Sequence, residues 1–254
     1  MKRQTAAFTW VELLMVIVII AVLAVLLLPA VSRTKGSAKR AVCVNNLKQI
    51  DAALRMYADD SGDKSPWIGT TNRVLDYCYK ELIQEYLAAR NADPSRQKLF
   101  ACPSDTFCYH LQPDDSHYLP KPRHEQAAGY FSSYSFNGAN QFANTFTNTG
   151  FGPLPGIGGR TMASIRHPLR TALVLEAPAA FPYSWHEPKN PLPVGNDLPL
   201  FNNAKDVVGF VDGHVRYIKI YWNTNMVAHG DTFLVSMAFE YDPPPEYEYQ
   251  WSGD

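Results

Sequence analysis

The sequence lacks an excess of charge of either sign. Its 254 residues carry 23 Lys and Arg side chains against 24 Asp and Glu, which gives a formal net charge of −1 at pH 7. Proteins that bind nucleic acid through its phosphates concentrate Lys and Arg instead. We therefore expect no nucleic-acid partner.

Two common motifs of hydrolytic enzymes are also missing. The chain contains neither the GxSxG nucleophile motif nor the HExxH zinc-protease motif. Glu81 and Glu85 stand four residues apart on a predicted helix, a spacing typical of a solvated helix face. We therefore expect that the protein is not an enzyme, and a membrane-anchored hydrolase is the alternative of that class.

Cysteine is scarce, and its spacing does not predict a metal centre. The four cysteines form no CxxC pair and no Cys/His cluster with zinc-finger spacing; they are Cys43, Cys78, Cys102 and Cys108. We therefore expect no metal site there. An even number of cysteines is typical of an oxidising compartment, where they form disulfides.

Charged residues are absent from Leu13 to Val31, a run of 19 residues. As an α-helix this run is about 28 Å long, close to the hydrocarbon thickness of a bilayer. The leader MKRQTAA carries Lys2 and Arg3, and a lone acid, Glu12, stands directly before the run. A charge inside a membrane-spanning segment is costly and usually has a partner. Glu12 therefore needs an explanation.

Two general interpretations explain the apolar run but not the acid. A secretory signal peptide has a basic start and an apolar centre, and PAVS at residues 29–32 offers a weak cleavage site. A plain membrane anchor explains the length of the run. Neither accounts for Glu12.

Residues 6–14, AAFTWVELL, resemble the cleavage site of type IV prepilins and type II secretion pseudopilins. The resemblance implies that a prepilin peptidase cuts between Ala7 and Phe8 and that Phe8 is then N-methylated. Thr9 and Glu12 become the second and fifth residues of the mature chain. The position before the cut is more often Gly in this family, so Ala7 is a departure from its pattern.

The same resemblance implies a role for Glu12. The new amino group of Phe8 pairs with Glu12 of a neighbouring subunit inside a fibre, and each charge offsets the burial cost of the other. The expected partners are the prepilin peptidase, other subunits contacted through the N-terminal helix, and the inner membrane.

Basic residues follow the apolar run at Arg33, Lys35, Lys39 and Arg40. The positive-inside rule places such residues in the cytoplasm, whereas in the family the leader is cytoplasmic. We give precedence to the cleavage motif. A single pass through the inner membrane with the head in the periplasm is therefore expected, with later extraction into a fibre as an option.

The apolar pattern continues as an amphipathic helix beyond Pro29, which is expected to bend the helix near its membrane exit. Spacings of 4, 3, 4 and 3 residues define one stripe, Cys43, Leu47, Ile50, Leu54 and Tyr57. The opposite face is predicted to carry Asn45, Lys48 and Asp51. Gly62 and Pro66 are expected to end the helix. Because Cys43 faces the core, we favour a Cys43–Cys102 disulfide, with Cys78–Cys108 as the second pairing.

In the head, helix and strand patterns alternate with loops. We expect a helix within residues 70–90, a short strand entering a turn at 98–105, and strands within 129–139, 170–177 and 231–241. Residues 206–220 predict a hairpin with Asp212-Gly213 as a two-residue type I′ turn. In that hairpin Val208 and Phe210 would share a face with Val215 and Tyr217.

The segment CVNNLKQIDAALRMYADDSGDKSP (residues 43–66) also resembles a large pseudopilin-like family named for a C-terminal His, nine residues and Asp-Gly. Asp212 and Gly213 match that Asp-Gly. The His position of the family falls on Asn202 here, which is a departure from its pattern.

Other polar residues predict no cofactor. His110, His117 and His124 are spaced seven apart, but intervening prolines exclude a continuous helix, so we expect surface loops. The pseudopilin resemblance suggests calcium as an alternative at Asp242, Glu246 and Glu248 near the C-terminus, because some major pseudopilins bind it in C-terminal loops. These residues lack the spacing of an EF-hand loop.

These observations predict an α+β protein in which a long N-terminal helix packs on a small antiparallel sheet with long loops. The expected parts are a cleaved leader (1–7), a transmembrane assembly helix (8–31), its amphipathic continuation (32–60) and an extracytoplasmic head (61–254). The expected function is a structural pseudopilin-like subunit. An adhesin-like tip protein that binds a ligand through residues 105–160 and 179–203 is the alternative.

Overall fold

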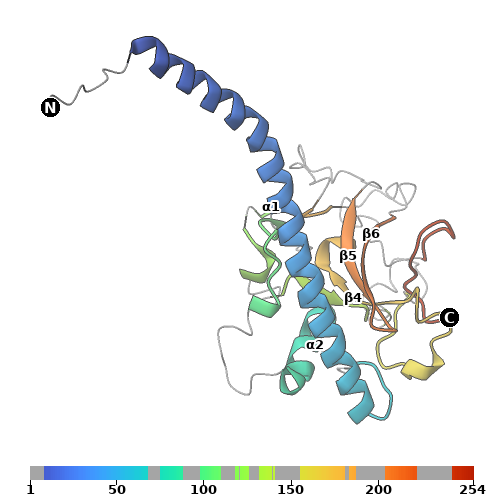
Figure 1. The fold of residues 1–254 in the computed structure, drawn as a ribbon. Coiled ribbons are helices and arrows are strands. Elements are labelled where there is room, and N and C mark those ends of the chain that lie inside the picture. Colours follow the sequence, from blue (N-terminus) through green and yellow to red (C-terminus); the bar gives the residue numbers. More distant parts are fainter. Residues whose placement is uncertain are drawn as a thin grey trace. The chain divides into compact units, whose positions relative to one another are not determined.

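The structure is a computed structural model and combines one long helix with a four-stranded antiparallel sheet (Figure 1). It describes residues 9–67, 75–87, 98–109, 118–119, 121–125, 132–138, 140, 155–180, 183–186, 204–221 and 242–254. The chain divides into two compact units, Met1–Lys39 and Arg40–Asp254. Helix α1 (Trp10–Asp60) contributes residues to both. The expected α+β fold class is confirmed.

The second part of α1, from Arg40 to Asp60, carries the predicted core stripe. Four of its members are buried, namely Cys43, Leu47, Ile50 and Leu54, and Tyr57 is half-buried. One residue departs from the prediction. Asp51 was assigned to the solvent face but is buried, because α1 packs against β5 and the side chain lies over Gly209 there.

Helix α1 ends where the sequence predicts. Gly62 and Asp63 both have positive φ, 67° and 62°, and the Asp63 amide donates to the carbonyl of Ala58 at 2.8 Å. This backward bond from a left-handed residue closes the last turn of the helix. The chain then reaches Pro66, which cannot continue a helix.

The sheet of the head has the order β3-β4-β5-β6, and each neighbouring pair is antiparallel. Its strands are β3 (Tyr134–Phe136), β4 (Ala172–Glu176), β5 (Lys205–Phe210) and β6 (Val215–Lys219). All five residues of β4 are buried, as expected for the apolar run at 170–177. Residues 40–60 of α1 and the short helix α2 pack on this sheet (Figure 1).

Shorter elements complete the described part of the head. Helix α2 (Leu75–Ile83) continues into a 3₁₀ turn η1 (Gln84–Tyr86) and buries Tyr79 and Ile83. Strands β1 (Cys108–Tyr109) and β2 (Tyr118–Leu119) form a separate antiparallel pair. Three further 3₁₀ turns are η2 (Arg123–Glu125), η6 (Met162–Ser164) and η7 (Ala177–Ala180).

Of the short strand and the following turn predicted at residues 98–105, the strand is wrong and the turn is present. Lys98 and Leu99 are helical, and the amide of Ala101 donates back to the Lys98 carbonyl. A turn follows in which the Asp105 amide donates to the Cys102 carbonyl at 3.0 Å. Backbone amides of this segment therefore bond to carbonyls three residues earlier instead of to a neighbouring strand. Pro103, which has no amide hydrogen, also favours a turn here.

The hairpin at 206–220 is confirmed, but its turn is not the predicted one. Gly213 donates to the Phe210 carbonyl, the Phe210 amide donates to His214, and Gly209 pairs with Val215. These bonds define a three-residue loop with Gly213 at φ 93°, a type I turn followed by a left-handed residue.

The extra loop residue shifts the register by one. Val207 pairs with Tyr217 and Val208 with Arg216, so Val208 does not share a face with Tyr217 as predicted.

The C-terminal residues attach to the start of β4. Thr171 forms a parallel bridge with Gln250, and the Ala172 amide donates to the Gln250 carbonyl at 3.0 Å. Asn137 adds a side-chain bond to the Trp251 carbonyl. The strand predicted at 231–241 lies outside the described residues.

Candidate functional site

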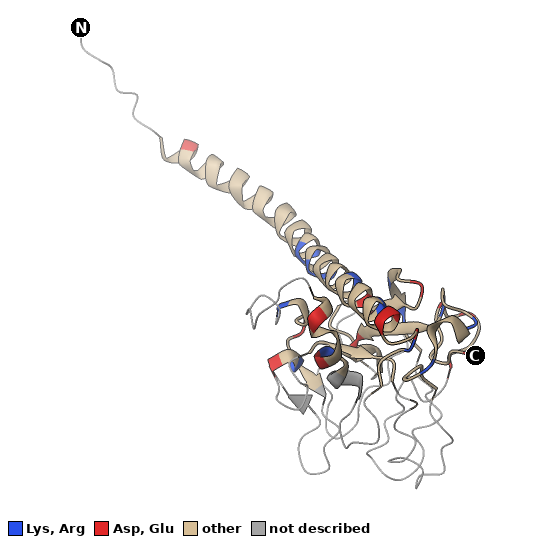
Figure 2. Cartoon of the chain, turned by 90° about the horizontal axis from the view of Figure 1, so that it is seen from below, with Lys and Arg blue, Asp and Glu red and all other residues tan. Residues whose placement is uncertain are grey.

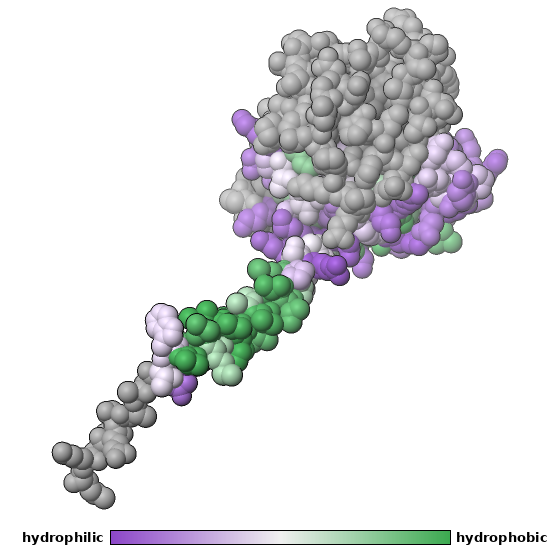
Figure 3. Space-filling view, turned by 90° about the horizontal axis from the view of Figure 1, so that it is seen from above, coloured by the Kyte–Doolittle hydropathy of each residue, from purple (hydrophilic) through white to green (hydrophobic). Residues whose placement is uncertain are grey.

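The first part of α1 presents a continuous apolar surface. Every residue from Trp10 to Val31 is exposed, and no charged residue occurs between Glu12 and Arg33. Figure 2 shows a single acidic position at the start of this part of the helix and no acidic or basic residue along the rest of it, and Figure 3 shows hydrophobic residues on its visible face. The helix is long and apolar enough to cross a membrane, by length and composition. A surface of this kind fits a membrane anchor or a helix–helix interface.

Glu12 takes part in the cap at the start of this helix. The backbone amide and the hydroxyl of Thr9 both donate to Glu12 Oε2, at 2.9 and 2.7 Å, and the Glu12 amide donates to Thr9 Oγ1 at 3.3 Å. Thr and Glu three residues apart form a capping box, which satisfies otherwise unpaired amides of the first turn. The sequence pattern T-x-x-E carries this signal, although the capping box is not among the features predicted above from the sequence.

The other residues predicted to act in cleavage and assembly are Ala7, Phe8 and Pro29. Ala7 and Phe8 lie outside the described residues. Pro29 lies inside α1, which continues through it to Asp60. The hydroxyl of Thr34 donates to the Ala30 carbonyl at 2.8 Å in the following turn.

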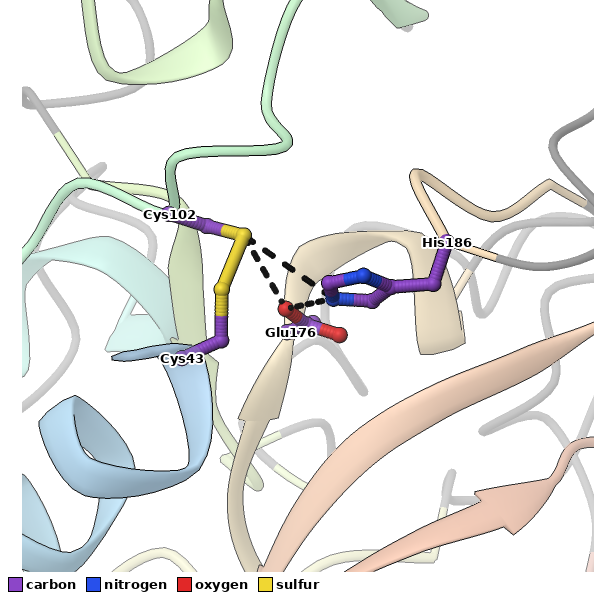
Figure 4. A group of neighbouring side chains, drawn as sticks. All are labelled: Cys43, Cys102, Glu176 and His186. Carbon is purple, nitrogen blue, oxygen red and sulfur yellow. Dashed lines mark hydrogen bonds and ion pairs between the residues drawn. A yellow bond between two sulfur atoms is a disulfide. The ribbon is translucent and has the colours of Figure 1, made fainter. Parts of the chain in front are cut away.

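A second group of polar side chains is buried in the head. The structure has a disulfide between Cys43 of α1 and Cys102, with a Cα–Cα distance of 5.4 Å, and this is the pairing that the sequence analysis put first. Glu176 at the end of β4 and His186 reach the same point (Figure 4). Neither of these two residues was predicted from the sequence as a site residue.

Short contacts hold these side chains together. Cys102 Sγ lies 3.2 Å from Glu176 Oε1 and 3.9 Å from His186 Nε2, and the Glu176 and His186 atoms are 2.8 Å apart. The ring of His186 also meets the ring of Tyr217 edge-on at 5.7 Å. All four polar residues of the group are buried. We call Cys43, Cys102, Glu176 and His186 the Cys–Glu–His cluster.

Another buried acid stands beside this cluster. Asp206 of β5 is fully buried, and its burial raises the pKa of its carboxyl well above the usual value, with the nearby charge of Glu176 acting in the same direction. Two acids thus share an interior region with one imidazole. Such groups are costly to bury unless a proton or a cation compensates their charge.

The second predicted disulfide is wrong. Cys108 is buried and its thiol is free, so it does not pair with Cys78. Burial raises the pKa of the Cys108 thiol to about 11. The side chain of Cys78 is outside the described part of the structure.

The predicted histidines and the family motif are only partly described. His124 is a partly exposed residue whose Nδ1 lies 2.9 Å from Asp105 Oδ2, while His110 and His117 fall outside the described residues. Asn202 is also outside them, as are most of the long segments considered for ligand binding. Asp212 lies in the hairpin loop, 2.5 Å from His214 Nδ1.

The three acids considered for calcium do not form one group among the described contacts. Asp242 accepts bonds from the amides of Trp251 and Ser252, at 2.6 and 2.9 Å. Glu248 pairs with Arg216 at 2.5 Å, and Glu246 is exposed. Asp242 and Glu248 therefore have structural partners that fix the C-terminal segment.

Comparison with known proteins identifies one similar region. Over 60 residues, 24% of this chain, the sequence is 40% identical to the type II secretion system core protein G of Pseudomonas aeruginosa. The chain spans 42% of the length of that curated relative. No protein-family model matches the chain, and no solved structure matches it significantly. The similarity supports a pseudopilin-like protein, and together with the apolar helix it fits a membrane-anchored one.

Proposed function

We propose that the chain is a structural, non-enzymatic subunit of a type II secretion or type IV pilus-like fibre and that it assembles through α1. The observation that carries this proposal is the exposed, uncharged surface of α1 from Leu13 to Val31, which opens with the single carboxylate of Glu12. The similarity to a type II secretion core protein supports the same assignment.

In this proposal a prepilin peptidase removes residues 1–7, and Phe8 becomes the methylated N-terminus. Phe8 directly precedes Thr9 of the capping box in the sequence, and its new amine pairs with Glu12 of an adjacent subunit. Both bonds from Thr9 reach Glu12 Oε2, and a carboxylate has about four acceptor positions in total. Glu12 can therefore cap its own helix and still accept an intersubunit bond.

The proposal also sets the orientation in the membrane. Cleavage from the cytoplasmic side leaves the head in the periplasm until the subunit is extracted into the fibre. The basic residues from Arg33 to Arg40 then lie on the periplasmic side, at the headgroups. The cleavage motif outweighs their positive-inside preference.

Two substitutions separate the intersubunit role of Glu12 from its role in the cap. Glu12→Gln keeps a side chain that serves a capping box but removes the charge. Thr9→Ala removes the two capping bonds made by the Thr9 hydroxyl and keeps the charge. We expect Glu12→Gln and Glu12→Val to insert into the membrane normally and to lower fibre incorporation about tenfold or more, whereas Thr9→Ala retains most of it.

The readouts are the mass of the mature N-terminus and the amount of chain in sheared or cross-linked fibres. The proposal expects methylated Phe8 as the first residue. A native chain that retains residues 1–7, or one that starts after Ala30, contradicts the processing step. Wild-type assembly of Glu12→Gln would show that the charge pair is not used, and an unchanged secretome with unaltered fibres in a strain lacking the chain contradicts the assembly role.

A further inference from the structure

The Cys–Glu–His cluster is independent of assembly through α1 and needs its own explanation. Its four ligand atoms, two sulfurs, one carboxylate oxygen and one ring nitrogen, all lie within 4.8 Å of one another, and all four residues are buried. Figure 4 shows the side chains converging from separate segments of the head. Buried convergence of four such donors is typical of structural metal sites.

The spacing of the donors fits a tetrahedral ion. With metal–ligand bonds of about 2.0–2.3 Å, the edges of a tetrahedral site are about 3.3–3.8 Å long. The corresponding distances here are 3.2 Å from Cys102 Sγ to Glu176 Oε1 and 3.9 Å from Cys102 Sγ to His186 Nε2. The 2.8 Å bond between Glu176 and His186 is shorter, and an inserted ion would replace it.

The donor set also fits the charge of zinc. Two thiolates, an imidazole and a carboxylate are ligands that Zn²⁺ uses in proteins, and soft sulfur donors disfavour Ca²⁺ and Mg²⁺. When Zn²⁺ binds, it replaces the two thiol protons of Cys43 and Cys102. The formal charge of the buried group is then unchanged if His186 is neutral, so the ion adds no net charge to the interior.

Contacts outside the four ligands hold three of them in position. The Val207 amide donates to Glu176 Oε2 at 2.8 Å, which leaves Oε1 directed at the sulfurs. The Ser104 amide donates to Cys102 Sγ at 3.4 Å, a contact that favours a thiolate. The His186 amide donates to Ser184 Oγ at 3.0 Å. Supporting bonds of this kind orient the ligands of metal sites.

We propose that the chain with reduced Cys43 and Cys102 binds one Zn²⁺ through these two thiolates, Glu176 and His186. The ion and the disulfide exclude each other, because the sulfurs must separate by roughly 1.5–2 Å to become zinc ligands. Both states tie α1 to the segment that holds Cys102. The zinc state additionally ties both to the end of β4 and to His186.

A small disulfide such as oxidised glutathione can convert the zinc state into the disulfide state in a reaction that balances in atoms and electrons. One thiolate attacks a glutathione sulfur, forms a mixed disulfide and releases one glutathione thiolate. The second thiolate displaces the other glutathione, and the Cys43–Cys102 bond forms. The protein loses two electrons, the glutathione disulfide gains them, and Zn²⁺ leaves as the hydrated ion.

Metal content of the full chain in detergent micelles tests the proposal. The chain is reduced anaerobically with a phosphine, which takes up an oxygen from water as it splits the disulfide, then incubated with ZnCl₂ and desalted. We expect one zinc per chain after reduction and none in the oxidised chain. Oxidised glutathione is expected to release the ion and restore the disulfide. A reduced chain without zinc, or an oxidised chain with as much, overturns the proposal.

Matched variants locate the ion. Glu176→Gln and His186→Ala are expected to lower zinc affinity at least tenfold, whereas Cys108→Ser and His167→Ala, a free buried thiol and an exposed histidine outside the cluster, leave it unchanged. If both cluster variants bind zinc as tightly as the wild type, the assignment is wrong.

Cobalt provides a readout that does not depend on the folding of any variant. Co²⁺ bound to the reduced wild-type chain is expected to show a thiolate charge-transfer band and the intense visible bands of a tetrahedral ion. A weak octahedral spectrum without thiolate bands contradicts the ligand set.

Discussion

The Asp51 carboxylate of α1 lies directly over the backbone of Gly209 in β5. A Cβ atom at position 209 would stand 2.6 Å from Asp51 Oδ2 and 2.9 Å from Oδ1, too close for any real contact. The absence of a side chain at Gly209 thus lets the helix approach the sheet at this crossing. Among the described residues, neither Asp51 oxygen has a hydrogen-bond partner.

Gly209→Ala is expected to destabilise the head by about 1–3 kcal/mol, the usual cost of overpacking a filled interior. The measurement is urea unfolding of the full chain in micelles. Adding Asp51→Ala should recover part of the loss, because the two residues are in contact and their effects are not additive. Strict additivity would show that the close approach is not the cause.

Asp51→Asn is expected to change how stability depends on pH. Burial raises the pKa of the Asp51 carboxyl well above its usual value; the charge of Arg55 opposes this shift and that of Asp212 adds to it. The folded state then keeps a proton that the unfolded chain releases above about pH 4, so stability falls as pH rises from there through the raised pKa.

The asparagine variant lacks this titration. Its melting temperature should exceed that of the wild type near pH 7, and the difference should shrink as pH falls towards 4. Asp59→Asn, an exposed acid of the same helix, is the matched control. A difference between wild type and Asp51→Asn that does not vary with pH contradicts the prediction.

Loss of the Cys43–Cys102 disulfide should destabilise the oxidised head by about 2–5 kcal/mol, because the bond closes a long loop in the unfolded chain. The two cysteines are 59 residues apart in sequence. Cys102→Ser tests this in urea unfolding without added metal. Equal stabilities of variant and wild type would argue against the bond in the native chain.

The thiol of Cys108 should resist alkylation in the folded chain. Its pKa of about 11, raised by burial, keeps it protonated at neutral pH, and the thiolate is the reactive form. Peptide mapping after iodoacetamide treatment should find Cys108 unmodified at pH 7.5 and modified once the chain is unfolded. Rapid labelling of the folded chain is the contrary result.

Gly213→Ala should cost about 1 kcal/mol or more, because φ of 93° at this hairpin position disfavours residues with a Cβ. Gly213→Asn should cost less, since Asn tolerates positive φ better than Ala does. Thermal unfolding compares the two. Equal costs would indicate that contacts of the new side chain, and not backbone strain, dominate.

Elements whose residue pattern lies within one continuous stretch of the chain could be predicted from the sequence. The spacing of Cys43, Leu47, Ile50 and Leu54 predicted the buried stripe, and the apolar run predicted β4. Asp51 was misassigned because helical periodicity alone predicts that a polar residue faces solvent. In the fold, the missing side chain at Gly209 leaves room for the Asp51 carboxyl in the interior. The hairpin register was missed by one residue, since Asp-Gly also occurs in loops of three residues.

The Cys–Glu–His cluster had no comparable signal. Its members come from α1, the turn at Cys102, the end of β4 and residue 186, and no short spacing connects them. Only the tertiary fold brings them together. By contrast, the T-x-x-E pattern at Thr9 is local, and it was available from the sequence.

The Cys43–Cys102 bond also has a mechanical consequence for a chain that is pulled from its two ends. Tension entering along the helix passes at Cys43 across the covalent bond to Cys102. The intervening polypeptide, about 200 Å long if fully extended, then carries no load. Stretching can therefore lengthen the oxidised molecule only through residues outside that loop.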